Sequence, residues 1–280
     1  MEKNSKANGL GCKFHRKLMF YVPLMYAIES RFLKRSRLGI IVWGTEYLIP
    51  VLLAFYLLNM SFHGIWIMLL AIIAVYNFYE IGYIQNDCET IKKEQNPTLR
   101  VKPQELNYYK SRKYLIYGFR LLLGTCLSWF FLNAASPWYI IVLLWLVIPF
   151  YWVYNTLRGR INLYLILPLT AYRYCMPFML LPDYENNHGT WMLLMVFVSY
   201  PLLKFIEICS GGKSLPQEQW TKIFMNGFEA RFGFRIKYYA VLTICLLVLQ
   251  FIDCEFMYIW LMPMYFLVLR TCQIKLPKLK

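Results

Sequence analysis

Charged residues are scarce in this chain of 280 residues. They make up 16% of it, and Asp and Glu number 15 against 30 Lys and Arg. A soluble domain carries roughly 25% charged residues, so the composition excludes a typical soluble protein. Hydrophobic residues reach 59%, which excludes intrinsic disorder. The net charge of +15 does not indicate nucleic-acid binding, because the basic residues lie between long apolar runs.

The chain also lacks the patterns of secreted domains and of common soluble enzymes. Its eight cysteines are scattered and include no Cys-x-x-Cys pair, so we expect reduced thiols rather than a disulfide framework. The three histidines show neither zinc-ligand spacing nor a Ser-His-Asp arrangement. The polar N-terminus has no small-residue cleavage site after a short apolar core, which argues against a secretory signal.

What the chain does have is a series of apolar stretches. Crossing a bilayer takes roughly 20 apolar residues at about 1.5 Å each. The stretches that meet this requirement lie near residues 38–60, 63–85, 114–133, 137–157, 161–182, 190–206, 236–252 and 255–272. We therefore predict an all-α integral membrane protein with eight transmembrane helices, or nine if the N-terminal segment also crosses.

The connections between these stretches alternate in charge. Of the 30 Lys and Arg residues, 28 fall in the segments 1–37, 86–113, 158–160, 204–237 and 270–280. The opposite connections contain none, and they lie near 61–63, 133–136, 183–189 and 253–255. Basic loops stay on the cytoplasmic side of a membrane. The pattern predicts a multi-pass protein with both termini in the cytoplasm, in the inner membrane if the cell is bacterial.

Residues 14–33 are apolar but contain four basic side chains, at His15, Arg16, Lys17 and Arg31. A ninth span here would carry the basic N-terminus outside, against the charge rule. We therefore expect an interfacial amphipathic helix. The expected domains are a basic N-terminal segment, 1–37, and a polytopic transmembrane domain, 38–280.

Acidic side chains recur at the end of the second predicted span, whose helix can continue as far as Pro97. At helical spacing one stripe holds Glu80, Asp87 and Glu94. Further polar residues beside or after this stripe are Tyr83, Asn86, Thr90, Lys92, Lys93, Arg100 and Lys102. Carboxylates beside cations suit a polyphosphate bridged by Mg²⁺. A solvated helix end with ordinary interfacial charges has the same pattern, and spacing alone favours neither interpretation.

A second polar segment follows the sixth predicted span. Lys204, Glu207 and Gly211 share one helical face. The pair Gly211-Gly212 then breaks the helix beside Lys213 and Ser214, where backbone N–H groups can cradle phosphate oxygens. The alternative is an ordinary glycine cap followed by a basic loop.

The polar segments resemble the signatures of the UbiA-type membrane prenyltransferases. NDCETIKKEQNPTLR (86–100) resembles Asn-Asp-x-x-Asp-x-x-x-Asp followed by Pro and Arg, with Thr90 at the middle Asp. EICSGGKS (207–214) resembles Asp-x-x-x-Gly-x-Lys-Ser, with Glu207 at the Asp. YNTLR (154–158) resembles the Tyr-x-x-x-Lys/Arg segment of the family.

The resemblance implies a cavity, open to the cytoplasm, in which Mg²⁺ holds a prenyl diphosphate. Its metal ligands would be Asp87, Glu94 and Glu207. Its catalytic residues would be Asp87 and Lys213. Its substrate-binding residues would be Asn86, Lys204, Ser214, Arg158, Arg100 and Tyr83. The partners implied are a polyprenyl diphosphate or polyprenyl phosphate lipid and a small aromatic or phosphoribosyl co-substrate, with no nucleic acid.

Two functions fit the sequence. One is Mg²⁺-dependent transfer of a prenyl group from a polyprenyl diphosphate, or of a phosphoribosyl group to a polyprenyl phosphate. The other is a non-enzymatic transporter or lipid-binding scaffold derived from a prenyltransferase, which the low acidic count favours.

Three further ionisable residues fall within predicted spans. Glu46 and Arg173 lie toward the middle of theirs, where charges are usually paired or functional. We expect a structural ion pair between them in preference to a role in substrate binding. Arg120 either extends to the membrane interface or points at a phosphate.

Overall fold

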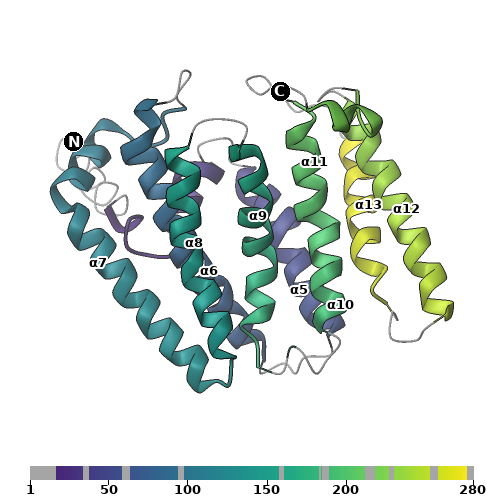
Figure 1. The fold of residues 1–280 in the computed structure, drawn as a ribbon, viewed down its shortest axis with the longest axis horizontal. Coiled ribbons are helices and arrows are strands. Elements are labelled where there is room, and N and C mark those ends of the chain that lie inside the picture. The colour runs from purple at the N-terminus through teal and green to yellow at the C-terminus, as the bar shows by residue number, and fades with distance from the viewer. Residues whose placement is uncertain are drawn as a thin grey trace, which may run out of the picture. The chain divides into compact units, whose positions relative to one another are not determined.

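The computed structural model consists of helices joined by short connections (Figure 1). It describes residues 17–33, 38–58, 64–93, 98–157, 161–182, 184, 189–211, 218–226, 230–252 and 258–275. Within these segments there is no strand. The prediction of an all-α protein is confirmed for this part of the chain.

Six helices among the described residues are long and apolar enough to cross a membrane. They are Gly39–Leu57, Gly64–Thr90, Pro103–Asn133, Trp138–Thr156, Gly189–Cys209 and Arg231–Ile252. Large apolar side chains on their surfaces are exposed, among them Trp66, Trp129 and Phe251. Such exposure is unfavourable in water and suits a lipid environment. The helices therefore support a membrane protein.

Two other predicted spans form helices without meeting the same requirement. The first is α9 (Ile161–Met179), in which Asn162, Arg173 and two prolines lower the mean hydropathy. The second is α13 (Leu261–Lys275), which has only 15 residues. The count of eight spans stays a prediction.

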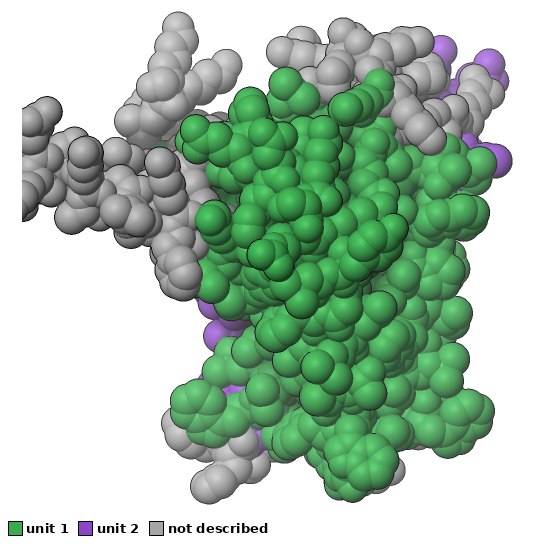
Figure 2. All heavy atoms as spheres, turned by 90° about the vertical axis from the view of Figure 1, so that its left-hand side faces the viewer, with its two compact units in different colours: residues 1–46, 66–158, 179–182 green, residues 47–65, 159–178, 183–280 purple. Residues whose placement is uncertain are grey.

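The chain folds into two compact units (Figure 2). Unit 1 comprises residues 1–46, 66–158 and 179–182. Unit 2 comprises residues 47–65, 159–178 and 183–280. The division predicted at residue 37 stays a prediction, and the packing groups residues 1–46 with residues 66–158 in unit 1.

Unit 1 is built around α6 (Gly64–Gln85), which continues into the π-helical turn η3 (Asn86–Thr90) and the short η4 (Ile91–Lys93). Helix α6 is apolar on all sides, and such helices are buried. Most of its residues beyond Ile72 are indeed buried. The long α7 (Pro103–Asn133) and α8 (Trp138–Thr156) pack with it.

Small residues set the distance between the helices of unit 1. A Cβ atom at Gly82 of α6 would lie 2.1 Å from the ring of Tyr151 on α8. At Gly124 of α7 it would lie 2.6 Å from the ring of Phe78. Glycine at these positions lets large aromatic rings pack against backbone, as membrane helices commonly do. Asn155 adds a polar contact, because its side chain donates to the Gly82 carbonyl at 3.0 Å.

The N-terminal segment differs from the single amphipathic helix expected over 14–33. Its described part begins at Lys17, and helical turns follow as α2 (Met25–Ala27) and η1 (Ile28–Phe32). Leu24, just after Pro23, has a φ of 70°, which separates these turns from the preceding residues. A continuous helix is disfavoured there because Pro23 lacks an N–H group.

The same segment is packed into unit 1 rather than exposed along its length. Phe20 and Tyr26 are fully buried, and both belong to a cluster with Ile84, Tyr109 and Ile116. These partners lie on α6 and α7. The N-terminal segment is therefore part of the core of unit 1.

Unit 2 contains most of the other helices. They are α5 (Ile49–Leu57), α9, α10 (Gly189–Phe197), η5 (Val198–Leu202), α11 (Leu203–Cys209), η6 (Gln219–Ile223), α12 (Arg231–Ile252) and α13. Helices α12 and α13 lie side by side (Figure 1). The rings of Tyr239 and Phe266 stack between them at 5.2 Å.

Proline shapes the middle of one helix in unit 2. Helices α10 and α11 are joined through the π-helical turn η5, which contains Pro201. The carbonyl groups of Val198 and Ser199 in this turn accept hydrogen bonds from the hydroxyls of Tyr238 (2.6 Å) and Tyr239 (2.7 Å). These tyrosines fix α12 to the turn. They satisfy carbonyl groups that a regular helix would pair internally.

Candidate functional site

Asp87 lies at the centre of a charged cluster at the end of the α6–η3 helix. Its side chain is fully buried. Arg31 places one nitrogen 3.2 Å from each carboxylate oxygen. Arg100 donates at 3.0 Å, the Tyr26 hydroxyl at 3.1 Å and the Asn86 amide at 3.3 Å. The cluster therefore unites the N-terminal segment, η3 and the residues before α7.

The electrostatics of the cluster favour its charged form. Burial alone would lower the pKa of Arg31, but the Asp87 carboxylate and the nearby tyrosines Tyr83, Tyr26 and Tyr151 together outweigh burial and raise that pKa above its ordinary value. Burial and then the Asp87 charge raise the pKa of Tyr26. Both side chains thus keep their protons at neutral pH and donate to Asp87. Two guanidinium groups against one carboxylate give the cluster one excess positive charge.

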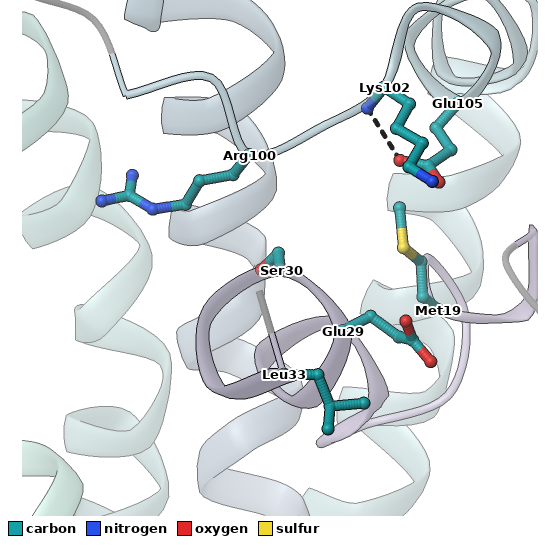
Figure 3. A pocket seen from close by; sticks show the side chains of 7 residues that line it. All are labelled: Met19, Glu29, Ser30, Leu33, Arg100, Lys102 and Glu105. Atoms are coloured by element: carbon teal, nitrogen blue, oxygen red, sulfur yellow. Dashed lines mark hydrogen bonds between the residues drawn. The ribbon is translucent and has the colours of Figure 1, made fainter. Parts of the chain in front are cut away.

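A pocket of about 180 Å³ lies beside this cluster. The residues that line it are Met19, Glu29, Ser30, Leu33, Arg100, Lys102 and Glu105. Figure 3 shows that the Arg100 side chain extends away from Glu29 and Lys102. The Lys102 backbone N–H donates to Glu105 at 2.8 Å, which caps the start of α7. Arg100 therefore belongs to both the Asp87 cluster and the wall of a polar pocket.

Aromatic rings continue from the cluster along α6 and α8. The Arg31 guanidinium lies 3.5 Å from the centre of the Tyr83 ring. Tyr83 packs against Tyr79 (5.0 Å between ring centres) and Tyr151 (5.9 Å). Aromatic faces attract cations and offer an apolar surface. The site thus combines half-buried cations with an aromatic wall.

Four predicted site residues come together in unit 1: Asn86, Asp87, Tyr83 and Arg100. Two further members, Tyr26 and Arg31, were absent from the predicted site. The sequence offered one signal for Arg31, as a basic residue that interrupts an apolar run. No local pattern pairs it with a carboxylate 56 positions away.

Glu80 does not join Asp87, contrary to the predicted stripe of carboxylates. Its carboxylate pairs with Arg120 at 2.9 Å, and both side chains are fully buried. It also accepts from the Ala27 backbone N–H at 2.7 Å. Arg120 donates to the Phe20 carbonyl at 2.8 Å. Arg120 was expected either to extend to the membrane interface or to point at a phosphate. It does neither, because this residue binds Glu80 and the N-terminal segment.

Glu207 anchors a second cluster, in unit 2. It is buried at the end of α11 and takes both a short bond from Arg235 Nε and a second bond, at 2.7 Å, from Arg235 Nη2. The Lys204 ammonium lies 3.6 Å away. Arg235, on α12, was not predicted from the sequence. Gly211 ends the helix with a φ of 93°, as expected of a glycine break.

Several predictions fall beyond what the structure describes. Glu94, Arg158, Lys213 and Ser214 lie outside the described residues. Asp87 and Glu207 belong to different units, so their expected proximity stays a prediction. Glu46 and Arg173 also belong to different units, so the expected ion pair between them stays a prediction as well.

The described residues include no group of three His, Cys, Asp or Glu side chains that would hold a metal ion. Both oxygens of Asp87 face guanidinium donors. A metal cation at the same oxygens would have to displace them, because like charges repel. The described part of the Asp87 cluster therefore fits an anion better than Mg²⁺. The predicted ligand set also includes Glu94, so Mg²⁺ binding stays a prediction.

No family model, no curated protein and no solved structure matches the chain.

Proposed function

We propose that the protein is a membrane-embedded transferase of the UbiA type. In this proposal it transfers a prenyl group from a polyprenyl diphosphate, or a phosphoribosyl group to a polyprenyl phosphate. The observation that carries the proposal is the Asp87 carboxylate clamped between Arg31 and Arg100 at the end of a buried, aromatic-rich helix. The resemblance of residues 86–100 and 207–214 to the family signatures is its second support.

The arginine pair suits the phosphate end of such a lipid. A guanidinium carries five N–H donors in a plane and binds phosphate oxygens in pairs. Arg31 uses one nitrogen on Asp87 and Arg100 another, which leaves further donors on each group for an anion. Asp87 orients the two guanidinium groups. When the bond to the diphosphate breaks, negative charge grows on the leaving group, and oriented cations stabilise it.

The aromatic wall suits the other end of the reacting bond. Positive charge develops on the prenyl carbon as the diphosphate leaves. The Tyr83 ring has Arg31 over one face, and Tyr151, which packs beside Tyr83, is buried away from bulk water. They would stabilise that carbon and keep water from it until the acceptor reacts. Mg²⁺, if bound, would supply additional neutralisation of the diphosphate.

A second candidate function is lipid binding without transfer. Every described polar contact of Asp87 is with a donor, so the cluster is a complete structural unit before any ligand enters. The same arginine pair would hold a polyprenyl phosphate as cargo. This is the scaffold or transporter interpretation.

The test uses the full chain in detergent with radiolabelled farnesyl diphosphate as the probe. Filter binding measures its affinity, and released diphosphate, in the presence of a membrane lipid extract, measures transfer. Arg100→Gln removes one guanidinium of the clamp. Arg112→Gln is the matched control, because Arg112 is exposed on α7 and outside the cluster.

We expect wild-type protein and Arg112→Gln to bind the probe and release diphosphate. Arg100→Gln should slow the release by roughly 10²-fold, which is typical for the loss of one oriented donor. Binding without release favours the lipid-binding function. If the wild type does not bind the probe, both candidate functions are contradicted. If the two variants release diphosphate at equal rates, the role of the Arg31 and Arg100 clamp is contradicted.

A further inference from the structure

We propose that the short helix η6 of unit 2, together with the Phe224 that follows it, is an interfacial anchor. It inserts the side chains of Ile223 and Phe224 among the lipids at the membrane surface, and Lys222 contacts the phosphate of an anionic phospholipid. The anchor lies within one unit and outside the three segments that resemble the UbiA signatures. It does not depend on the proposed transfer reaction.

The first argument is what η6 exposes. Ile223 is 83% exposed and Phe224 is 51% exposed, and the two are neighbours in the chain. Exposure of adjacent large apolar side chains is unfavourable in water. Lys222, just before them, is exposed as well. A cation beside aliphatic and aromatic side chains is typical of segments that lie in the membrane interface.

The exposed pair belongs to a well-bonded turn. Thr221 and Met225 are buried. The backbone N–H groups of Phe224 (3.0 Å) and Met225 (2.8 Å) donate to the Thr221 carbonyl, and the Thr221 hydroxyl donates to the Glu218 carbonyl at 2.6 Å. The buried residues hold η6 on unit 2. The same turn therefore keeps Ile223 and Phe224 on the outside.

The second argument is the position of η6 beside the span Gly189–Cys209. The Glu218 backbone N–H donates to the carbonyl of Cys209, the last residue of that span, at 2.9 Å. The Trp220 ring stacks on the ring of Phe205, with centres 5.9 Å apart. Phe205 lies about one turn inside the end of the span. After the span the chain thus turns back along it, so η6 lies beside the last turn of the span.

The next span, which contains α12, places η6 at the same level. The Phe224 ring lies 6.2 Å from that of Phe234, which lies 5.9 Å from that of Tyr238. Phe234 is about one turn inside the start of α12. At this level the two spans also carry charged side chains, Glu207 and Arg235. Charges mark the headgroup region of a bilayer rather than its hydrocarbon core.

This depth defines the occupant of the exposed surface. A headgroup layer is about 5–7 Å thick on each side of a bilayer, which is close to the rise of one helical turn. Apolar side chains one turn inside the ends of the spans therefore meet the upper part of the acyl chains. Lys222 stays among the phosphates, and its charge favours anionic lipids over zwitterionic ones.

The test places the full chain in nanodiscs of mixed phosphatidylcholine and phosphatidylglycerol. Ile223 is replaced by the photoreactive residue p-benzoylphenylalanine, which on irradiation bonds to C–H groups that it touches, and mass spectrometry identifies the adduct. Because Ile223 is exposed, the larger side chain fits there without disturbing the core.

The matched control carries the same photoreactive residue at Gln104, which is exposed near the start of α7. Helix α7 has 31 residues. At about 46 Å it is longer than the roughly 30 Å hydrocarbon core. Its exposed residues before Lys113 are mostly polar, so this end of the helix lies outside the acyl chains.

We expect a lipid adduct at position 223 and none at position 104. Lys222→Gln, combined with the photoreactive residue at 223, should lower the ratio of phosphatidylglycerol to phosphatidylcholine in the adduct roughly fivefold. This is the factor by which one cation near an anionic surface favours binding. Lys110→Gln removes an exposed cation of α7 and should leave the ratio unchanged.

Four results would overturn the anchor. An adduct with a second copy of the chain or with another protein would show that the exposed pair is a protein interface. A folded protein without any adduct at 223 would place η6 in water. An unchanged lipid ratio in Lys222→Gln would remove the headgroup contact, and an equal drop in Lys110→Gln would indicate diffuse attraction. Arg100→Gln, in unit 1, should leave the adduct unchanged, so a failure of the transferase proposal leaves this anchor standing.

Discussion

The ion pair of Glu80 and Arg120 should control the attachment of the N-terminal segment to unit 1. Both side chains are fully buried, and their nearest charged atoms are 2.9 Å apart. Arg120 also donates to backbone carbonyls in the segment, at Phe20 (2.8 Å) and Met19 (3.3 Å). Glu80 accepts from the Ala27 N–H. One pair therefore holds the segment from two sides.

Arg120→Met is the decisive change. Methionine fills much of the volume but leaves the Glu80 carboxylate buried without its cation. Removing one partner of a buried pair costs about 3–5 kcal/mol, and each buried carbonyl left unpaired adds about 1–3 kcal/mol. A whole protein is stable by only about 5–15 kcal/mol. We therefore expect a loss of at least about 3 kcal/mol, which corresponds to roughly 6 °C or more in Tm for a chain of this size.

Two measurements in detergent check the expected loss of stability in Arg120→Met. Tryptophan fluorescence gives Tm, and trypsin gives the rate of cleavage at Lys17 and Arg31 in the N-terminal segment. If the loss is local to the segment, cleavage should accelerate by roughly 10²-fold, since 1.4 kcal/mol is tenfold in population. Arg112→Met is the control, because exposed substitutions usually change stability by less than about 0.5 kcal/mol.

The double variant Glu80→Gln with Arg120→Met separates charge from packing. It leaves no buried charge, so it should be less destabilised than the sum of the two single variants. Neighbouring groups typically deviate from additivity by about 0.5–3 kcal/mol. The pair does not anchor the segment if Arg120→Met behaves like Arg112→Met, or if the double variant is destabilised by the full sum.

Topology, helix packing and metal dependence can each be tested separately. Cysteine labelling should reach 133–136 from outside the cell and 86–113 only from the cytoplasm, and the inverse pattern would refute the topology. Gly82→Ala should destabilise the protein by about 1–3 kcal/mol through overpacking against Tyr151, whereas Gly118→Ala, which meets open space, should not. EDTA should leave binding of farnesyl diphosphate largely intact if the arginine pair carries it. Loss of all binding in EDTA, restored by Mg²⁺, would instead place a metal at the site.

The helices could be predicted from the sequence because their signal is local. Length, apolarity and the sparing use of charge identify each span without reference to the others. The same local signal is weaker where a helix is only partly apolar, as in α9 with its prolines and Arg173, and whether α9 crosses the membrane stays a prediction. The signal fails for the N-terminal segment, whose burial involves Arg120, about 100 positions away.

The site could be predicted only as far as helical spacing reaches. Asn86 and Asp87 are neighbours in sequence, and Arg100 follows closely, so a local motif includes all three. Spacing also placed Glu80 on the stripe of Asp87 and so grouped it with the Asp87 cluster. That grouping was wrong, because Glu80 pairs with Arg120. A helical face shows which side chains point the same way, but not which residue of another helix meets them. Arg31 and Arg235 are such partners.

Under the proposed resemblance, residues 86–100 have fewer acids than the UbiA signature. Thr90 stands where the signature has its middle Asp, and its hydroxyl contacts the Asn86 side chain at 3.2 Å. Asn86 in turn donates to Asp87. Thr90 thus orients Asn86 and adds no negative charge.

Both retained carboxylates in the described residues are, in the same way, bound by arginines. Asp87 has Arg31 and Arg100, and Glu207 has Arg235. A site that binds a diphosphate through metal ions needs more carboxylates to hold the metal ions. A site that binds a diphosphate through guanidinium groups needs only enough carboxylates to orient those groups. The two guanidinium groups that Asp87 holds fit this second arrangement, and they make the arginine clamp the first part of the molecule to test.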